Sequence, residues 1–169
     1  MSLRRSCPLL GLPNTDTLSI EWEGHPHALR LADVDPEQAA PGSWKPPTEF
    51  GRRTFRWARE TALKEVREVE VEFPAEEVVF SNTGKLLAYV FAGGENYNVR
   101  LVREGWSPCF CKYGHPRAYR REMEQAEQWA RDEGRGVWGG RGGRGDYPLG
   151  LAGSVASHAL VRVGLRQSK

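Results

Sequence analysis

A short segment with cysteine and histidine offers the densest set of potential metal ligands in the chain. Cys109, Cys111 and His115 lie within seven residues of one another. Thiolate and imidazole are ligands that zinc prefers, but a structural zinc site takes four of them. We see no second pair of such ligands. We therefore expect packed or partly exposed thiols here, with zinc binding as the less favoured alternative.

Several charged residues could do acid–base or phosphate chemistry, although each is ordinary when it is taken alone. Asp16 has the neighbours of a turn residue. Arg30 and Lys85 fall on expected strands, where such side chains are usually solvated or ion-paired. Glu37 lies in a proline-rich loop and is typical of a solvated carboxylate. Only the order of the motifs around them favours a joint role.

Composition restricts the class of protein. The 169 residues are 39% hydrophobic and 27% charged, which is typical of a soluble globular chain. No apolar run approaches the roughly 20 residues that cross a bilayer, so we expect no membrane partner. Three cysteines indicate a reducing compartment. Prolines interrupt the N-terminal stretch before it can form a signal peptide, and we expect a cytoplasmic protein.

The charge is unevenly distributed along the chain. The net charge is +2, and residues 134–169 carry six Lys and Arg against one Asp. We divide the chain into a lead (1–13), a domain (14–138), a Gly/Arg-rich linker (139–148) and a basic C-terminal extension (149–169). The Gly/Arg segment could hold single-stranded nucleic acid electrostatically, but a flexible linker is the favoured interpretation.

Hydrophobic periodicity predicts a small barrel with helices. Strands are expected at 16–23, 27–35, 69–73, 78–80 and 86–92. Helices are expected at 51–66, 98–104 and 117–133, the first capped by Thr54 or Thr48. Four prolines make residues 36–47 a long loop. This order fits an α+β, mainly β fold, namely a five-stranded Greek-key barrel of the oligonucleotide-binding (OB) type with about three helices.

Four motifs in order strengthen that interpretation. They are Asn14-Thr15-Asp16-Thr17; Arg30 to Asp35 followed by Pro36-Glu37; Thr83-Gly84-Lys85-Leu86-Leu87-Ala88-Tyr89 running into Asn98 and Leu101-Val102-Arg103-Glu104-Gly105-Trp106; and Gly136-Val137-Trp138. Together they resemble the staphylococcal nuclease (thermonuclease) family over residues 14–138. Each motif is weak alone, but their order and intervals make the resemblance specific.

The resemblance implies a calcium-dependent phosphodiesterase that acts on DNA or RNA. It makes Asp16 and Asp35 the metal ligands, together with the Pro36 carbonyl, and Arg30 a phosphate clamp. Carboxylates and carbonyls are the hard oxygen ligands that calcium prefers, and a guanidinium fork suits a phosphate. Tyr113 falls where the family stacks a tyrosine near the nucleotide. We expect a monomer that acts on single strands.

The sequence departs from the family pattern near the expected reaction centre. Lys85 stands where the family has a second arginine, and it loses the bidentate geometry. The general base is Glu37 if one residue is deleted, but the ungapped alignment puts Gln38 there, and an amide cannot accept the proton. Asn14 replaces a carboxylate. A non-catalytic module that binds nucleic acid or protein is therefore the alternative function.

Overall fold

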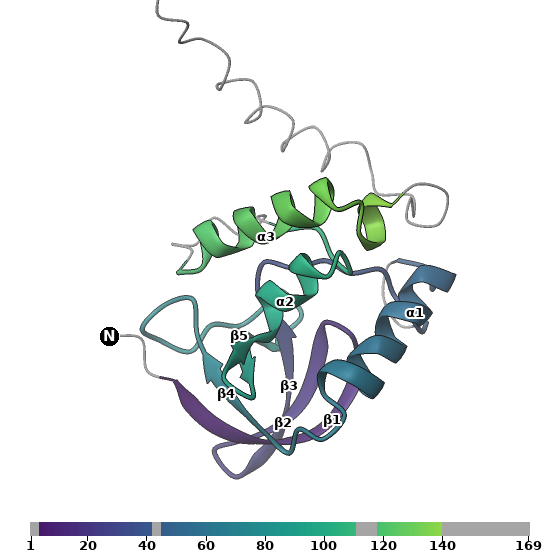
Figure 1. The fold of residues 1–169 in the computed structure, drawn as a ribbon. Coiled ribbons are helices and arrows are strands. Elements are labelled where there is room, and N and C mark those ends of the chain that lie inside the picture. Colours follow the sequence, from purple (N-terminus) through teal and green to yellow (C-terminus); the bar gives the residue numbers. More distant parts are fainter. Residues whose placement is uncertain (1–3, 42–44, 111–117, 140–169) are drawn as a thin grey trace, which may run out of the picture.

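A closed barrel of five strands forms the body of the protein (Figure 1). The computed structural model describes residues 4–41, 45–110 and 118–139. The strands are β1 (Arg5–Asn14), β2 (Thr17–Trp22), β3 (His25–Leu31), β4 (Glu68–Glu72) and β5 (Leu86–Ala92). Antiparallel pairs join β3 to β2, β2 to β1, β1 to β4 and β4 to β5, and a parallel β3–β5 pair closes the barrel. The expected five-stranded OB-type barrel is confirmed.

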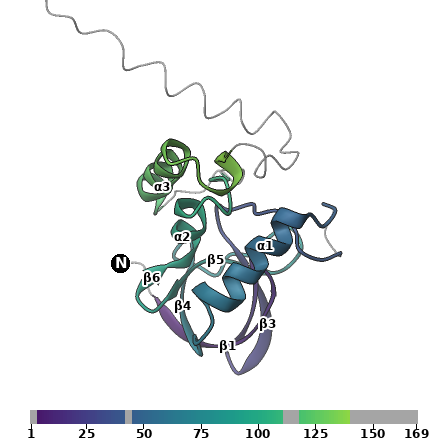
Figure 2. The same ribbon diagram turned by 45° about the vertical axis from the view of Figure 1, so that its right-hand side comes forward.

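Helices cover one side and one end of the barrel. They are α1 (Glu49–Trp57) with a π-helical turn (Ala58–Ala62), α2 (Tyr97–Arg103) and α3 (Arg120–Asp132), followed by a 3-10 turn (Gly136–Trp138). A two-residue strand, β6 (Glu95–Asn96), pairs with β5 and leads into α2. Helix α2 lies between the barrel and α3, whereas α1 runs beside the barrel (Figures 1 and 2). No helix among the described residues is long and apolar enough to cross a membrane.

Strand β1 was missed by the sequence analysis, which treated residues 1–13 as a lead outside the barrel. Pro8 and Pro13 lie within this strand although proline cannot donate to a ladder. Pro8 still pairs in register with Glu68 of β4, whereas the pairing with β2 has two register irregularities, on either side of Gly11. Cys7 of this strand is buried in the core. The expected strand at 78–80 instead makes one isolated bridge, between Phe80 and Leu86.

Glu72 lies on β4, where Val and Glu alternate, but unlike an ordinary strand glutamate it does not face water. Its side chain is buried. Arg4 Nε donates to Glu72 Oε2 at 2.9 Å, and the Tyr119 hydroxyl donates to the same oxygen at 2.8 Å. A buried carboxylate is tolerated when it is paired and hydrogen-bonded. Glu72 therefore ties the start of the chain to the segment that enters α3.

Some sequence predictions lie outside the described residues. These are Tyr113, the zinc alternative at Cys111 and His115, and all but the first residue of the linker and extension at 139–169. Of the two expected helix caps, Thr48 is the one that caps α1.

Candidate active site

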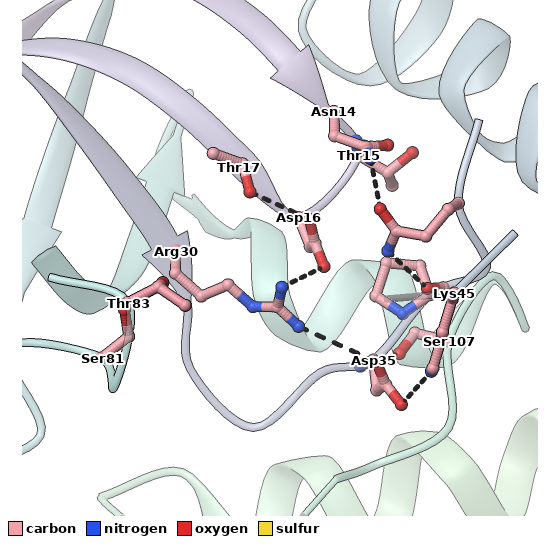
Figure 3. Close-up of polar contacts among 12 residues, drawn as sticks. Asn14, Thr15, Asp16, Thr17, Arg30, Asp35, Lys45, Ser81, Thr83 and Ser107 are labelled. Atoms are coloured by element: carbon pink, nitrogen blue, oxygen red, sulfur yellow. Dashed lines mark hydrogen bonds and ion pairs between the residues drawn. The ribbon is translucent and has the colours of Figure 1, made fainter. Parts of the chain in front are cut away.

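The site begins with Arg30, which lies near the end of β3. The β2–β3 register places Thr17 opposite Arg30, so Asp16 just before β2 is brought next to it. Arg30 Nη1 lies 3.0 Å from Asp16 Oδ2, and Nη2 lies 3.8 Å from Asp35 Oδ1. Figure 3 shows the guanidinium pointing toward both carboxylates. The structure thus brings together Arg30, Asp16 and Asp35, the three residues placed by the first two motifs.

Both carboxylates are almost fully buried, while Arg30 reaches the surface. Side-chain exposure is 1% for Asp16, 8% for Asp35 and 30% for Arg30. Backbone hydrogen bonds fix the carboxylates: Leu31 N donates to Asp16 O at 2.9 Å, and Asp35 N donates to Ser107 Oγ at 2.8 Å. Two fixed acids therefore flank one partly accessible guanidinium, an arrangement that can bind a phosphate on its open side.

Lys45 adds a second cation, which the sequence analysis did not select. Its Nζ forms an ion pair with Asp35 Oδ2, visible in Figure 3. Lys45 lies in the proline-rich loop between β3 and α1, where no periodicity indicates which side chains point inward. A lysine in that loop was the only available signal.

Glu37 is held by the start of helix α1. The Thr48 hydroxyl donates to Glu37 Oε2, and the same hydroxyl oxygen accepts from Gly51 N at 2.8 Å as the cap of α1. Glu37 is buried, and in the described part of the chain its other carboxylate oxygen, Oε1, has no hydrogen-bond partner. The role of Glu37 as the general base stays a prediction.

Gln38 forms an amide pair with Asn14. Asn14 Nδ2 donates to Gln38 Oε1, and Gln38 Nε2 donates to the Pro36 carbonyl at 3.3 Å. Asn14 directly precedes the turn that carries Asp16, so Gln38 reaches the site's edge. Two carboxylates at these positions would repel each other, whereas two amides are complementary. Neither amide can accept a proton from water.

The backbone of Gln38 is fixed by close packing against α1. A side-chain carbon on Gly51 would lie 2.0 Å from the Gln38 carbonyl oxygen, so only glycine allows this approach. That carbonyl also accepts from Thr48 N at 3.0 Å. Helix α1 therefore positions the start of the loop that carries Glu37 and Gln38.

Lys85 follows the turn that precedes β5. Its backbone N donates to Ser81 Oγ at 3.2 Å, and Ser81 and Thr83 hydroxyl oxygens lie 3.0 Å apart. Among the described residues, the Lys85 ammonium has no ion pair. Parallel pairing of Arg30 with Leu87 sets this turn beside β3. Lys85 thus lies on the strand next to Arg30, and its phosphate role stays a prediction.

Buried polar residues hold the loops around the site. Tyr97 donates its hydroxyl to Thr15 O at 3.2 Å. Burial, with a smaller contribution from the negative charge of Asp16, raises the pKa of Tyr97 far above its ordinary value, so it stays a neutral donor. Asn98 Nδ2 donates to Ala32 O at 2.9 Å and Oδ1 accepts from Val90 N at 3.0 Å. These contacts fix both the Asp16 turn and the chain leading to Asp35.

The donor set fits a hard divalent cation, although with few ligands. Asp16 Oδ2 is buried and accepts no hydrogen bond in the described structure; its only contact there is the ion pair with Arg30. Asp35 provides the second carboxylate. The described residues contain no group of three or more acidic, histidine or cysteine side chains that could hold a metal. Two carboxylates supply hard oxygen donors of the kind that calcium prefers, but fewer than the about six to eight ligands it takes.

Comparison with known proteins gives the same family as the motifs. The family described as staphylococcal nuclease homologue matches residues 28–140. The thermonuclease of Staphylococcus intermedius is 30% identical over 125 residues, which are 73% of this chain and 70% of that protein. The thermonuclease of Staphylococcus hyicus is 27% identical over 125 residues, which are 73% and 69% of the two chains. The family match includes Arg30, Asp35 and Lys85, whereas Asp16 lies before it.

Proposed function

The chain belongs to the staphylococcal nuclease family, and on that premise we propose that it hydrolyses phosphodiester bonds of nucleic acid, slowly and with calcium. The observation that carries the proposal is the Arg30 guanidinium between two buried carboxylates. A site of this kind has a partly exposed fork for a phosphate and hard oxygen donors beside it. The substrate class we propose is single-stranded DNA or RNA, bound by a monomer.

Each residue of the site has a separate task in this proposal. Asp16 and Asp35 would hold calcium, which when bound polarises a phosphoryl oxygen and offsets the charge that develops on it. Arg30 would bind the phosphate through its fork and orient it. Lys85 would contribute a second positive charge without the geometric match of an arginine.

Activation of water is the weak step of the proposed reaction. Gln38 stands where the ungapped family alignment puts the general base, and its amide is paired with Asn14. Glu37, the other candidate, is bonded to Thr48. Loss of a positioned general base typically lowers a rate by about 10²–10⁴-fold. The proposed hydrolysis is therefore slow rather than absent.

A nuclease assay on denatured DNA tests the proposal. We expect cleavage by the wild type in calcium, none in EDTA, and a loss of about 10²-fold or more in Arg30→Ala, because one preorganised donor is removed. Arg56→Ala is the matched control, since Arg56 is an exposed arginine of α1. Cleavage that survives EDTA, or equal rates for Arg30→Ala and Arg56→Ala, would contradict the proposal.

The neutral Asn14–Gln38 pair favours a second candidate function, binding of nucleic acid without hydrolysis. In that case denatured DNA would bind to the wild type and remain intact with calcium present. Arg30→Ala would weaken the binding, and Arg56→Ala would not. A filter-binding measurement beside the cleavage assay separates the two functions.

A further inference from the structure

Lys45 is a cation of the site that none of the four motifs includes. Its Nζ pairs with Asp35 Oδ2, while the other carboxylate oxygen of Asp35 faces Arg30 Nη2 at 3.8 Å. The Lys45 side chain is only 16% exposed. An ammonium group therefore lies against one of the two carboxylates that are proposed to hold the metal.

Among the described side chains in direct ion pairs at the site, negative and positive charges are equal in number. Asp16 and Asp35 bring two negative charges, and Arg30 and Lys45 bring two positive charges in direct ion pairs with them. A divalent cation is attracted by carboxylate charge, and a neighbouring ammonium reduces that attraction. Lysine suits such a role because it is a compact charge on a flexible stem that can be displaced.

From this balance we propose that Lys45 is a built-in competitor of the divalent ion at Asp35 and keeps the metal affinity of the site low. The inference rests on the proposed function, because it concerns the same carboxylates. A calcium ion that binds Asp35 must first displace the Lys45 ammonium. Lys45 is thus a residue that sets the metal requirement of this chain.

The loop that carries Lys45 is held close to the site at its base. Gln38 bridges to Pro47, and Gln38 O accepts from Thr48 N at 3.0 Å. Lys45 lies two residues before this bridge, and from there its Nζ reaches Asp35 Oδ2. Lys85 is no substitute, because among the described residues its ammonium pairs with neither carboxylate.

Calorimetric titration of the full chain with calcium alone, without nucleic acid, tests the inference. We expect Lys45→Met to bind calcium about tenfold more tightly than the wild type, or better, because a competing charge is gone. Lys64→Met is the matched control, since Lys64 is an exposed lysine that takes no part in these ion pairs. The calcium affinity of this variant should equal that of the wild type. Lys45→Arg should keep the low affinity.

A second readout does not depend on catalysis. The thermal midpoint of Lys45→Met should rise at calcium concentrations that leave the wild type unchanged, because a ligand stabilises the state that binds it. If Lys45→Met does not fold, Lys45→Gln serves in its place, since it retains a hydrogen-bond donor for Asp35. Equal calcium affinity of the uncharged variant and the wild type would overturn the inference, and so would no detectable binding by either.

The test separates this inference from the proposed function. If wild-type hydrolysis needs calcium but Lys45→Met binds it no better, the inference fails and the function stands. If Lys45→Met gains affinity and no variant cleaves DNA, the inference stands and the function fails.

Discussion

Glu37 and Gln38 are adjacent in the chain, yet their side chains make different contacts. Glu37 accepts from the hydroxyl that caps α1, and Gln38 pairs with Asn14 beside the Asp16 turn. The cap itself is Thr48, and its bond holds the Glu37 carboxylate at the start of α1, whereas Gln38 lies beside the turn that carries Asp16. From these contacts we propose position 38, rather than position 37, as the place for a general base.

Gln38→Glu should raise the proposed calcium-dependent hydrolysis by at least about tenfold, because a carboxylate then stands where water must be activated. The gain is limited by the lost hydrogen bond from Gln38 Nε2 to the Pro36 carbonyl. Glu37→Gln, the matched control, should leave the rate within about twofold. Initial rates on denatured DNA at several calcium concentrations provide the measurement.

The opposite pattern would identify Glu37 as the base. If Glu37→Gln abolishes cleavage and Gln38→Glu does not increase it, the one-residue deletion is the correct alignment. Thermal unfolding of both variants, measured in parallel, shows whether a variant that has lost activity is still folded.

The sequence could predict part of this site and not the rest. Arg30, Asp16 and Asp35 converge because the β2–β3 register brings Thr17 opposite Arg30, and strand register follows from hydrophobic alternation. The choice between Glu37 and Gln38 could not be made, because a loop has no period and one residue of slip exchanges the two side chains. Lys45 was missed for the same reason.

At the scale of elements, the helices fix loops by contacts that leave little trace in a sequence. The close approach of Gly51 to the Gln38 carbonyl is one example, because a glycine in a helical sequence does not reveal which backbone packs against it. Another is Glu127 of α3, whose Oε1 accepts from Cys109 N at 3.2 Å. That hydrogen bond anchors the chain after α2 to α3.

Glu127 should make stability depend on pH in a direction set by its burial. Burial raises the pKa of Glu127, and Arg131 together with the Cys109 N–H only partly oppose the shift. The native state then holds this proton more tightly than the unfolded state, so Glu127's contribution to stability is lost as pH rises from its ordinary value of 4.5 through the raised native value.

Glu127→Gln keeps an acceptor for Cys109 N and removes the ionisation. Its free energy of unfolding should exceed that of the wild type at neutral pH, by about 1 kcal/mol or less, and the difference should vanish at low pH. Denaturant titrations between acidic and neutral pH measure it. A wild type that is the more stable one at neutral pH would mean that the Arg131 interaction outweighs burial.

At the scale of the whole molecule, the sequence was sufficient for the fold but not for its first strand. Alternation located β2, β3 and β4, which have one more deeply buried side, and a continuous apolar run located β5, which is buried almost throughout. Prolines concealed β1, although Cys7 and its neighbours pair with β4. The parallel β3–β5 pair that closes the barrel cannot be predicted from local sequence patterns, because it joins segments more than fifty residues apart.

The residues of the described hydrophobic core run in sequence from Cys7 to Ala126. The segment that follows α3 packs next to them. Val137 is buried and its N donates to Gly105 O at 2.9 Å, and the Arg131 guanidinium lies 3.6 Å from the centre of the Trp138 ring. A side-chain carbon on Gly136 would lie 2.0 Å from Gly105 O. These contacts make residues 136–138 part of the barrel domain.

Two truncations should therefore differ in their effect on unfolding. A chain that ends after Gly140 should unfold cooperatively with a free energy within about 0.5 kcal/mol of the full chain, because the core residues and the closing turn remain. A chain that ends after Gly134 loses the burial of Val137 and the Trp138 contact, and should be less stable by about 2 kcal/mol or more. Denaturant unfolding of the three chains, followed by tryptophan fluorescence and by circular dichroism, provides the comparison.

A loss of several kcal/mol in the chain that ends after Gly140 would place residues 149–165 in the folded domain, and the boundary at residue 138 would be wrong.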